Sequence, residues 1–327
     1  TDETLSVIKN FTDERITVDT LKENVHSTCA ANILMQRARG KYVAFICSDD
    51  AWMSDKLAQQ VAYLEAHPHC AVVFSRVEVI DERSRPYRLP TAYDCQFNLQ
   101  PNRASWAWLR FLYGFDNPFC CSSALLRLTV WQEYGPYDER SRNVQDLLLW
   151  TRILFHYDVH ILEQKLTRMR YLARRTNVSA VSLANMVLSA NEAQLFYAIF
   201  YEELTLSAVF QEIFPDSSPL CSAMGDRDPQ VALALHTLAF LPTPMAGVAY
   251  AMRALYSLTK NSEQRQLLQQ RYGFGILDLY AQAEGADVYG MRRSLFKETL
   301  REAAKKLLQH LHLLMPLKYY LIQRALR

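Results

Sequence analysis

The stretch that decides the fold is residues 38–52, which read ARGKYVAFICSDDAW. The run Tyr42–Cys47 is short and rich in β-branched and aromatic residues, so it predicts an interior strand of a parallel sheet. Gly40 before it predicts the left-handed residue that closes a preceding helix. Two carboxylates, Asp49 and Asp50, follow the strand. Ligands of open α/β sheets bind at the carboxyl ends of the strands, which is where these side chains emerge.

An adjacent pair of carboxylates suits a hard divalent cation such as Mg²⁺ or Mn²⁺. Such an ion takes oxygen ligands and usually shares its coordination sphere with the phosphates of a substrate. The residues alone leave a second interpretation open, in which Asp49 or Asp50 caps the helix that begins near Asp55.

The segments on either side alternate between helix and strand patterns. Capping residues at Thr1–Thr4 predict a helix start, and further helices are expected at about 28–39 and 55–66. Strands are expected at 15–18, 70–74 and 120–126, and the last of these places Ser122 and Ser123 near the acidic residues. This alternation predicts an α/β fold with a mostly parallel sheet flanked by helices. Residues 82–103 are rich in Pro, Arg and Tyr and predict a long surface connection.

Strand patterns fade after about residue 179, and apolar residues recur at helical spacing instead. Helices are expected within 190–214, 227–241, 244–259 and 262–271. The chain is therefore expected to have an α/β domain at 1–180 and an all-α domain at 181–327. The long apolar passage Val231–Met252 contains Pro242 and Pro244, which predict two packed helices rather than a membrane span.

The charge is unevenly distributed. The net charge of +2 does not indicate a nucleic-acid-binding protein. From Arg292 onward, however, nine Lys and Arg stand against Glu298 and Glu302, a net of +7, which leaves −5 for the rest of the chain. Apolar residues from Phe296 to Leu314 fall on one helical face. Two interpretations stay open for this basic helix, namely contact with an anionic membrane surface and packing with a solvated basic face.

Seven cysteines without a Cys-x-x-Cys pair suit a reducing compartment and argue against structural zinc or a disulfide framework. Cys47 and Cys70 lie in apolar runs and are expected to be small core side chains. The chain starts with acidic and mixed residues rather than a secretory signal, so a cytoplasmic location is expected.

Two blocks of the chain resemble the bacterial family 2 glycosyltransferases over about residues 1–180. The first block comprises Asn32, Ala38, Gly40, Tyr42, Ser48-Asp49-Asp50, Trp52 and Lys56-Leu57. The second comprises Gly135-Pro136-Tyr137-Asp138-Glu139 and Gln145-Asp146-Leu147-Leu148-Leu149-Trp150-Thr151-Arg152. Their order and separation are those of the family.

The resemblance implies a GT-A-like fold and transfer of a sugar from a nucleotide-sugar donor to a saccharide or lipid-linked acceptor in cell-surface polysaccharide synthesis. It implies that Asp49, Asp50 and Asn32 bind the donor, with Asp50 and Asp49 also holding Mg²⁺ or Mn²⁺. Asp146 would be the general base of an inverting displacement. The other role open to Asp146 is the N-cap of a helix at 147–156, and one residue can serve in both roles. A lipid-linked acceptor would bring the enzyme to the inner face of the cytoplasmic membrane.

Several positions depart from the family pattern. Cys47 stands where the acidic motif often begins with Asp, Ala31 replaces an Arg, Gln145 replaces a Glu, and Arg174 stands near the place of a metal-binding His. The family's Asp-Gly-Ser loop and first strands are expected before Thr1, so the chain resembles a fragment truncated at its start. A non-catalytic relative that serves in binding or assembly is therefore the alternative to a metal-dependent transferase.

Overall fold

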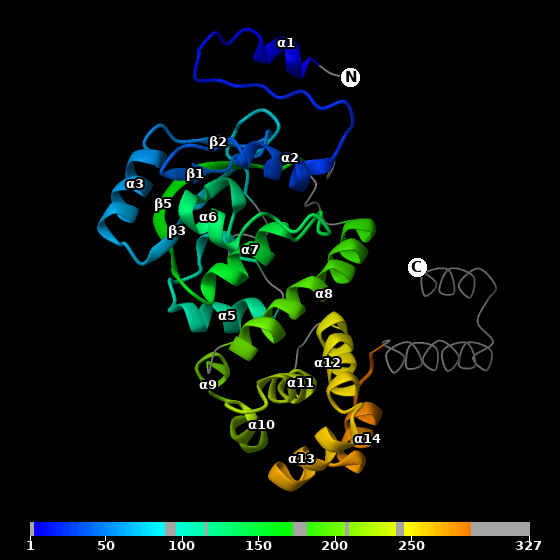
Figure 1. The fold of residues 1–327 in the computed structure, drawn as a ribbon. Coiled ribbons are helices and arrows are strands. Elements are labelled where there is room, and N and C mark those ends of the chain that lie inside the picture. The colour runs from blue at the N-terminus through cyan, green and yellow to red at the C-terminus, as the bar shows by residue number, and fades with distance from the viewer. Residues whose placement is uncertain are drawn as a thin grey trace, which may run out of the picture.

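The computed structural model of the chain describes residues 3–88, 96–114, 117–172, 182–206, 209–239 and 245–288. These residues form a mixed sheet flanked by helices and, toward the bottom of Figure 1, a group of helices. The predicted α/β fold with a helical region after it is confirmed for this part of the chain.

The sheet has five strands in the order β1–β4–β3–β5–β2. Their bounds are β1 Tyr42–Ala44, β2 Ala51–Trp52, β3 Cys70–Ile80, β4 Leu125–Arg127 and β5 Asp158–Arg170. β3 and β5 pair in parallel, whereas β1–β4, β3–β4 and β2–β5 pair antiparallel. The sheet is thus mixed, and the expectation of mostly parallel pairing is wrong for the described strands. Apolar patterning reports burial and carries no information on the direction of a neighbouring strand.

β1 lies at the edge of the sheet, so the prediction that it is an interior strand is also wrong. It covers only the first half of the predicted run, and its residues are half-buried. The ladder ends after Ala44 pairs with Leu125, and the backbone N–H of Cys47 donates to Ser122 Oγ at 3.0 Å. Cys47 is exposed, so its predicted core position is wrong, whereas Cys70 is buried as expected.

Helices cover both faces of the sheet (Figure 1). They are α3 Lys56–Ala66 on one face, and α5 Ser105–Tyr113, α6 Leu128–Tyr134 and α7 Gln145–Leu154 on the other. Successive strand residues point to opposite faces. Val73 of β3 accordingly packs with Leu64 of α3, while Phe74 packs in the larger cluster with α7. There Phe74 stacks on Phe119 at 4.6 Å between ring centroids and meets the edge of Trp150 at 5.2 Å.

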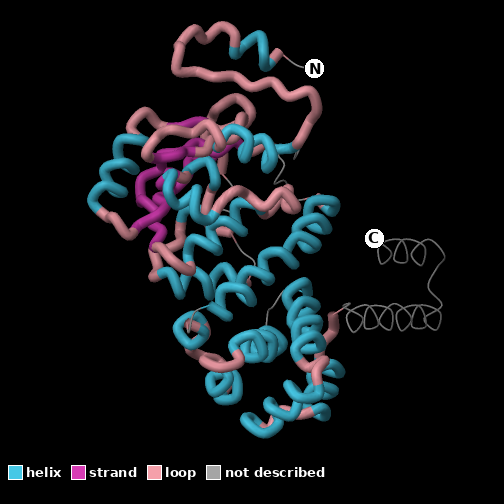
Figure 2. The backbone as a smooth tube through the Cα atoms, viewed as in Figure 1, coloured by secondary structure: helices cyan, strands magenta, loops and turns pink. Residues whose placement is uncertain are grey.

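The start of the chain lies away from the sheet (Figures 1 and 2). The predicted first helix is α1, Thr4–Ile8, and it buries no residue. Residues 15–18 form no strand, so that prediction is wrong. Ile16 and Val18 are exposed, and a short apolar run without a partner strand gains no ladder hydrogen bonds.

The helix before β1 is α2, His26–Met35, and it ends earlier than predicted. Its C-cap residue, Gln36, keeps right-handed backbone angles. Gly40 has no positive φ, so its predicted role as a left-handed cap is wrong. A left-handed glycine does close a later helix, at Gly273 with φ +70°.

The helical region follows the sheet. Its helices are α8 Leu183–Leu206, α9 Phe210–Ile213, α10 Pro219–Met224, α11 Pro229–Ala239, α12 Met245–Leu258, α13 Ser262–Tyr272 and α14 Ile276–Gly285. α8 packs against α7, α11 and α12, and one apolar cluster contains Trp150, Phe200 and Leu233. The core therefore runs continuously from the sheet into the helices, and a domain boundary at residue 180 stays a prediction.

α11 and α12 pack against each other, as predicted for the passage Val231–Met252. Among the helices that the structure describes, none is long and apolar enough to cross a membrane. Other predictions lie outside the described residues, namely those on residues 89–95, Arg174, Pro242, Pro244 and the basic segment from Arg292.

Candidate active site

The acidic loop, residues 47–50, joins β1 to β2. The backbone N–H of Asp50 donates to the Cys47 carbonyl at 3.1 Å, which turns the loop back on itself. Ligand atoms of Cys47, Asp49 and Asp50 all lie within 4.8 Å of one another. The structure thus brings the predicted carboxylate pair together. Neither carboxylate caps α3, because Asp55 occupies its N-cap and Asp50 Oδ1 accepts from the Arg170 backbone N–H at 2.9 Å.

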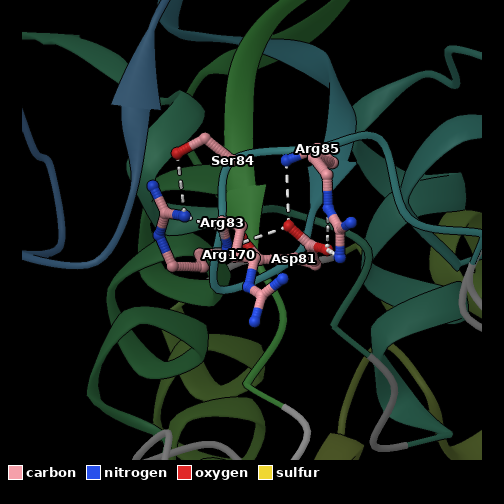
Figure 3. A network of polar contacts seen from close by, with 5 residues as sticks. All are labelled: Asp81, Arg83, Ser84, Arg85 and Arg170. Atoms are coloured by element: carbon pink, nitrogen blue, oxygen red, sulfur yellow. Dashed lines mark hydrogen bonds and ion pairs between the residues drawn. The ribbon is translucent and has the colours of Figure 1, made fainter.

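Arg170, the last residue of β5, holds the acidic loop from the side. Its Nε donates to the Asp49 carbonyl at 2.8 Å, and one terminal nitrogen donates to the Asp81 carbonyl at 2.7 Å and to Ser84 Oγ at 3.1 Å. Asp81 and Ser84 belong to the turn that follows β3. Figure 3 shows Arg170 beside this turn, in which the Asp81 carboxylate accepts from the Arg85 side chain. The guanidinium therefore ties the acidic loop to the turn after β3.

Ser122 holds the loop from the other side. The segment predicted as a strand at 120–126 is instead a 3₁₀ turn at Cys121–Ser123 followed by β4. This turn lets Ser122 Oγ accept the Cys47 N–H while its carbonyl accepts the Trp52 indole N–H at 2.8 Å. The prediction that Ser122 lies near the acidic residues is confirmed.

The electrostatics of the loop follow from its partial burial. Burial raises the pKa of Asp50, and hydrogen bonds from Ser122 and the Arg170 N–H act against the rise. Although Cys47 is exposed as a residue, partial desolvation of its thiol raises the pKa of that group, and so do the nearby charges of Asp50, Asp49 and Asp146. A protonated thiol is a poor metal ligand, so the two carboxylates are the donors that this loop offers to a hard cation.

Asp146 lies in the first turn of α7, whose N-cap is Val144, so Asp146 is not the cap. Its Oδ1 accepts from the Leu147 N–H at 2.8 Å, and its Oδ2 accepts from Asn117 Nδ2 at 3.0 Å. Burial raises the pKa of Asp146 to about 6, and these two hydrogen bonds act against the rise. A carboxyl group with a pKa near 6 is ionised at neutral pH and is still basic enough to take a proton.

Asp146 and the acidic loop face a common neighbourhood. The charge of Asp146 raises the pKa of Cys47 in the loop and of Cys121 and Tyr137 beside it. Asp146 is therefore close enough to the Cys47 thiol, about a hundred positions earlier in the chain, to act on it electrostatically.

Asn32, on α2, is buried and bonds to the loop before α7. It is 5% exposed, its Oδ1 accepts the Tyr137 N–H, and its Nδ2 donates to the Tyr137 carbonyl and to Glu139 Oε1. The amide thus holds the loop that precedes α7.

Beneath the acidic loop lies a buried lysine that the sequence did not single out for this role. Lys56 Nζ donates to Gln60 Oε1 at 2.7 Å and lies 4.4 Å from the centre of the Trp52 ring. Burial lowers the pKa of Lys56 to about 8. Gln60 in turn donates to the carbonyls of Val73 and Ser123, so this group links α3 to the strands under the site.

A shallow pocket of about 230 Å³ lies elsewhere, at the start of β5, where Ser105, Trp106, His156 and Asp158 are among its lining residues. The parallel strands β3 and β5 run from this end toward the acidic loop, so the pocket and the carboxylates are at opposite ends of these strands. Neither the acidic loop nor Asp146 is therefore among the residues that line this pocket.

Comparisons with known proteins give matches to glycosyltransferases. Residues 1–126 match the family model described as glycosyl transferase family 2. The chain is 36% identical over 88 residues to the putative teichuronic acid biosynthesis glycosyltransferase TuaG of Bacillus subtilis, covering 26% of this chain and 34% of that protein. It is 26% identical over 193 residues to the UDP-Glc:alpha-D-GlcNAc-diphosphoundecaprenol beta-1,3-glucosyltransferase WfaP of Escherichia coli, covering 54% and 69%.

Among solved structures, the chain is similar to S. aureus TarS 1-349 in complex with UDP, with 14% identity and a TM-score of 0.46 over 83% of this chain and 79% of that one. The chain spans about half the length, 52%, of another relative, the putative glycosyltransferase EpsE of Bacillus subtilis, at 27% identity over 46% of this chain.

We expect Arg170→Gln to loosen the acidic loop, because the shorter neutral side chain cannot reach both the Asp49 and Asp81 carbonyls. Amide hydrogen exchange over residues 47–52 should rise, and the free energy of unfolding should fall by about 1–3 kcal/mol. Arg168→Gln is the matched control on the same strand, since Arg168 forms a solvent-exposed ion pair with Glu78. Equal exchange of the loop in both variants would show that Arg170 does not hold it.

Proposed function

We propose that the protein transfers a sugar from a nucleotide-sugar donor to an acceptor hydroxyl in cell-surface polysaccharide synthesis, since residues 1–126 match the family model described as glycosyl transferase family 2. The proposal is supported by two acidic groups that both act on the Cys47 thiol, namely the Asp49–Asp50 pair in a loop held by Arg170 and Ser122, and Asp146 in the first turn of α7. Such a transfer needs a site for the departing diphosphate and a base for the acceptor hydroxyl. The acidic loop would supply the first and Asp146 the second.

In this proposal Asp49 and Asp50 hold Mg²⁺ or Mn²⁺ together with the donor diphosphate. Two carboxylates completed by substrate phosphates are the ligand set that Mg²⁺ prefers. The metal, when bound, would neutralise charge on the leaving diphosphate. The chain's own contribution is to keep the loop in place, through the contacts of Arg170 and Ser122.

Asp146 is the proposed general base. Its carboxylate takes the proton of the acceptor hydroxyl, the acceptor oxygen bonds to the anomeric carbon, and the bond from that carbon to the diphosphate breaks in the same displacement. The configuration at the anomeric carbon inverts. Asn117 contributes by donating to Asp146 Oδ2, because its own Oδ1 is fixed by the Phe119 N–H and its amide nitrogen therefore faces the carboxylate.

The donor is proposed to be a uridine diphosphate sugar, as the name of the WfaP relative states for that protein. Asn32 contributes to the donor site through the loop 137–139 that its amide holds. The acceptor is proposed to be a saccharide or a lipid-linked saccharide, and the enzyme would then work at the inner face of the cytoplasmic membrane.

The proposed donor site predicts that an Asp49→Asn, Asp50→Asn double variant loses at least tenfold in affinity for UDP in the presence of Mn²⁺. Amides keep the shape of the loop but remove the charge that holds the cation. Calorimetric titration of the full chain measures this loss. Asp55→Asn is the control, because the Asp55 carboxylate bonds to Gln59 on the exposed side of α3. Unchanged binding by the double variant would contradict the metal site and favour a non-catalytic relative.

The proposed base predicts that Asp146→Asn lowers turnover by about 10²- to 10⁴-fold, the usual contribution of general base catalysis, while UDP binding is retained. Turnover is followed as nucleotide release with acceptor present. In the wild type the rate should fall as the pH drops below about 6, because protonation of Asp146 removes the base, whereas an ordinary aspartate would stay active to about pH 4.

Asp216→Asn is the control for the base, since the Asp216 carboxylate is exposed and pairs with Arg110 away from the loop before α7. Transfer by Asp146→Asn within a few-fold of the wild type would show that another group takes the proton.

The proposed membrane location predicts that the chain co-sediments with vesicles containing anionic lipid and that binding falls steeply with added salt. Replacing Arg301, Lys305 and Lys306 by Gln should weaken binding, because each basic residue near an anionic surface adds about 1 kcal/mol. A variant with the same change in net charge, Lys9, Lys22 and Lys165 to Gln, is the control. Equal sedimentation of both triple variants would rule out the C-terminal segment as the contact.

A further inference from the structure

Glu192 of α8 is a buried carboxylate with an unusual set of partners. It is 6% exposed and accepts four hydrogen bonds from the loop before α7. The donors are Ser141 Oγ at 2.9 Å, Arg142 N at 2.8 Å, Asn143 N at 2.9 Å and Val144 N at 3.1 Å. Among the ion pairs of the described residues, none involves Glu192. Its charge is met by these hydrogen bonds and by the positive end of α7.

The bonded loop is the one that sets the start of α7. Val144 is the N-cap of α7, and Asp146 lies two residues later in the first turn. Three consecutive backbone N–H groups ending at the cap are bound to one side chain, so the position of the first turn depends on where Glu192 holds them. Asn143 Nδ2 adds a bond to Ser189 Oγ, one turn earlier on α8.

α2 holds the same loop from the opposite side. Thr28 Oγ1 donates to the Ser141 carbonyl at 2.8 Å, and Asn32 bonds to the backbone of Tyr137. The loop 137–144 is therefore fixed between a helix of the sheet region and the first helix of the helical region. Figure 1 shows α7 lying between the sheet and α8.

We propose that Glu192 is a positioning residue through which the helical region holds Asp146 in place for catalysis. The inference rests on the proposed function, since it acts through the proposed base. It gives the helical region a role in the reaction, whereas the acidic loop, residues 47–50, is held by Arg170 and Ser122 without it.

Only a carboxylate can make this set of contacts. Glu192 Oε1 accepts from Arg142 N, and Oε2 accepts from Ser141, Asn143 and Val144. Glutamine has one accepting oxygen and one donating nitrogen, so in either orientation its amino group faces at least one backbone N–H. Glu192→Gln therefore keeps the shape of the side chain but breaks this clamp, by which we mean the four hydrogen bonds from residues 141–144 to the Glu192 carboxylate.

The experiment compares Glu192→Gln with Glu203→Gln in the full chain. Glu203 also lies on α8, but it bonds to His156 beyond the other end of α7. Glu192→Gln should raise amide hydrogen exchange at residues 142–147 and lower kcat at least tenfold, with the Kd for UDP and Mn²⁺ within twofold of the wild type. Glu203→Gln should leave all three unchanged.

The inference is overturned if exchange at 142–147 does not change, or if exchange rises while kcat stays within twofold of the wild type. A parallel loss of kcat and UDP binding would also overturn it, because that is the result of general destabilisation. If Glu192→Gln does not fold, Ser189→Ala takes its place, since it removes the Asn143 contact without leaving a buried charge, and the same split is expected on a smaller scale. Failure of Asp146→Asn to lower turnover would refute the proposed base alone, because the exchange measurement tests the clamp independently.

Discussion

The parallel pairing of β3 with β5 is the constraint on which the candidate site depends. Its register brings Ile80 opposite Arg170, so the last residue of β5 lies beside the turn that follows β3. β2 pairs antiparallel with the same end of β5, which brings the acidic loop next to Arg170. A shift of one residue in this register would turn the side chains of β5 to the opposite face and remove the Arg170 guanidinium from the loop. The apolar side chains of β3, buried on both faces of the sheet, specify that register.

The two chemical groups of the site are held by different parts of the protein. The acidic loop is held by the sheet, through Ser122 and Arg170, and carries two carboxylates in a partly buried position. Asp146 is held by helices, and its raised pKa follows from burial that Asn117 only partly offsets. Both arrangements keep charge in places where water is limited, which costs stability and makes the groups reactive. In the proposed site, the acidic loop beside the sheet would bind the leaving group, and Asp146 in the first turn of α7 would take the proton.

The helical region is part of the same structure as the sheet. The core is continuous from Trp150 through Phe200 to Leu233, and Glu192 reaches across this contact to the loop before α7. A contact of this kind makes the geometry of the base sensitive to the packing of α8. The pocket near Asp158 lies at the far end of β3 and β5 and has no contact with either chemical group.

Local patterns in the sequence were sufficient to predict the α/β fold, the helices α3, α11, α12 and α13, and the pair Asp49 and Asp50. Each of these features depends on residues that are close to one another in the chain. Local patterns were not sufficient for the direction and order of the strands, so β1 was expected in the interior of a parallel sheet and lies at the edge of a mixed one. The side chains that hold the site come from segments 29 to 121 positions away from the groups they contact, as with Asn117 and Asp146 or Arg170 and Asp49. Such partners have no periodic or spacing signal, because their approach is produced by strand register and helix packing. The sequence by itself therefore determined which groups carry charge near the ends of strands, and only the tertiary structure decided which other side chains hold them there.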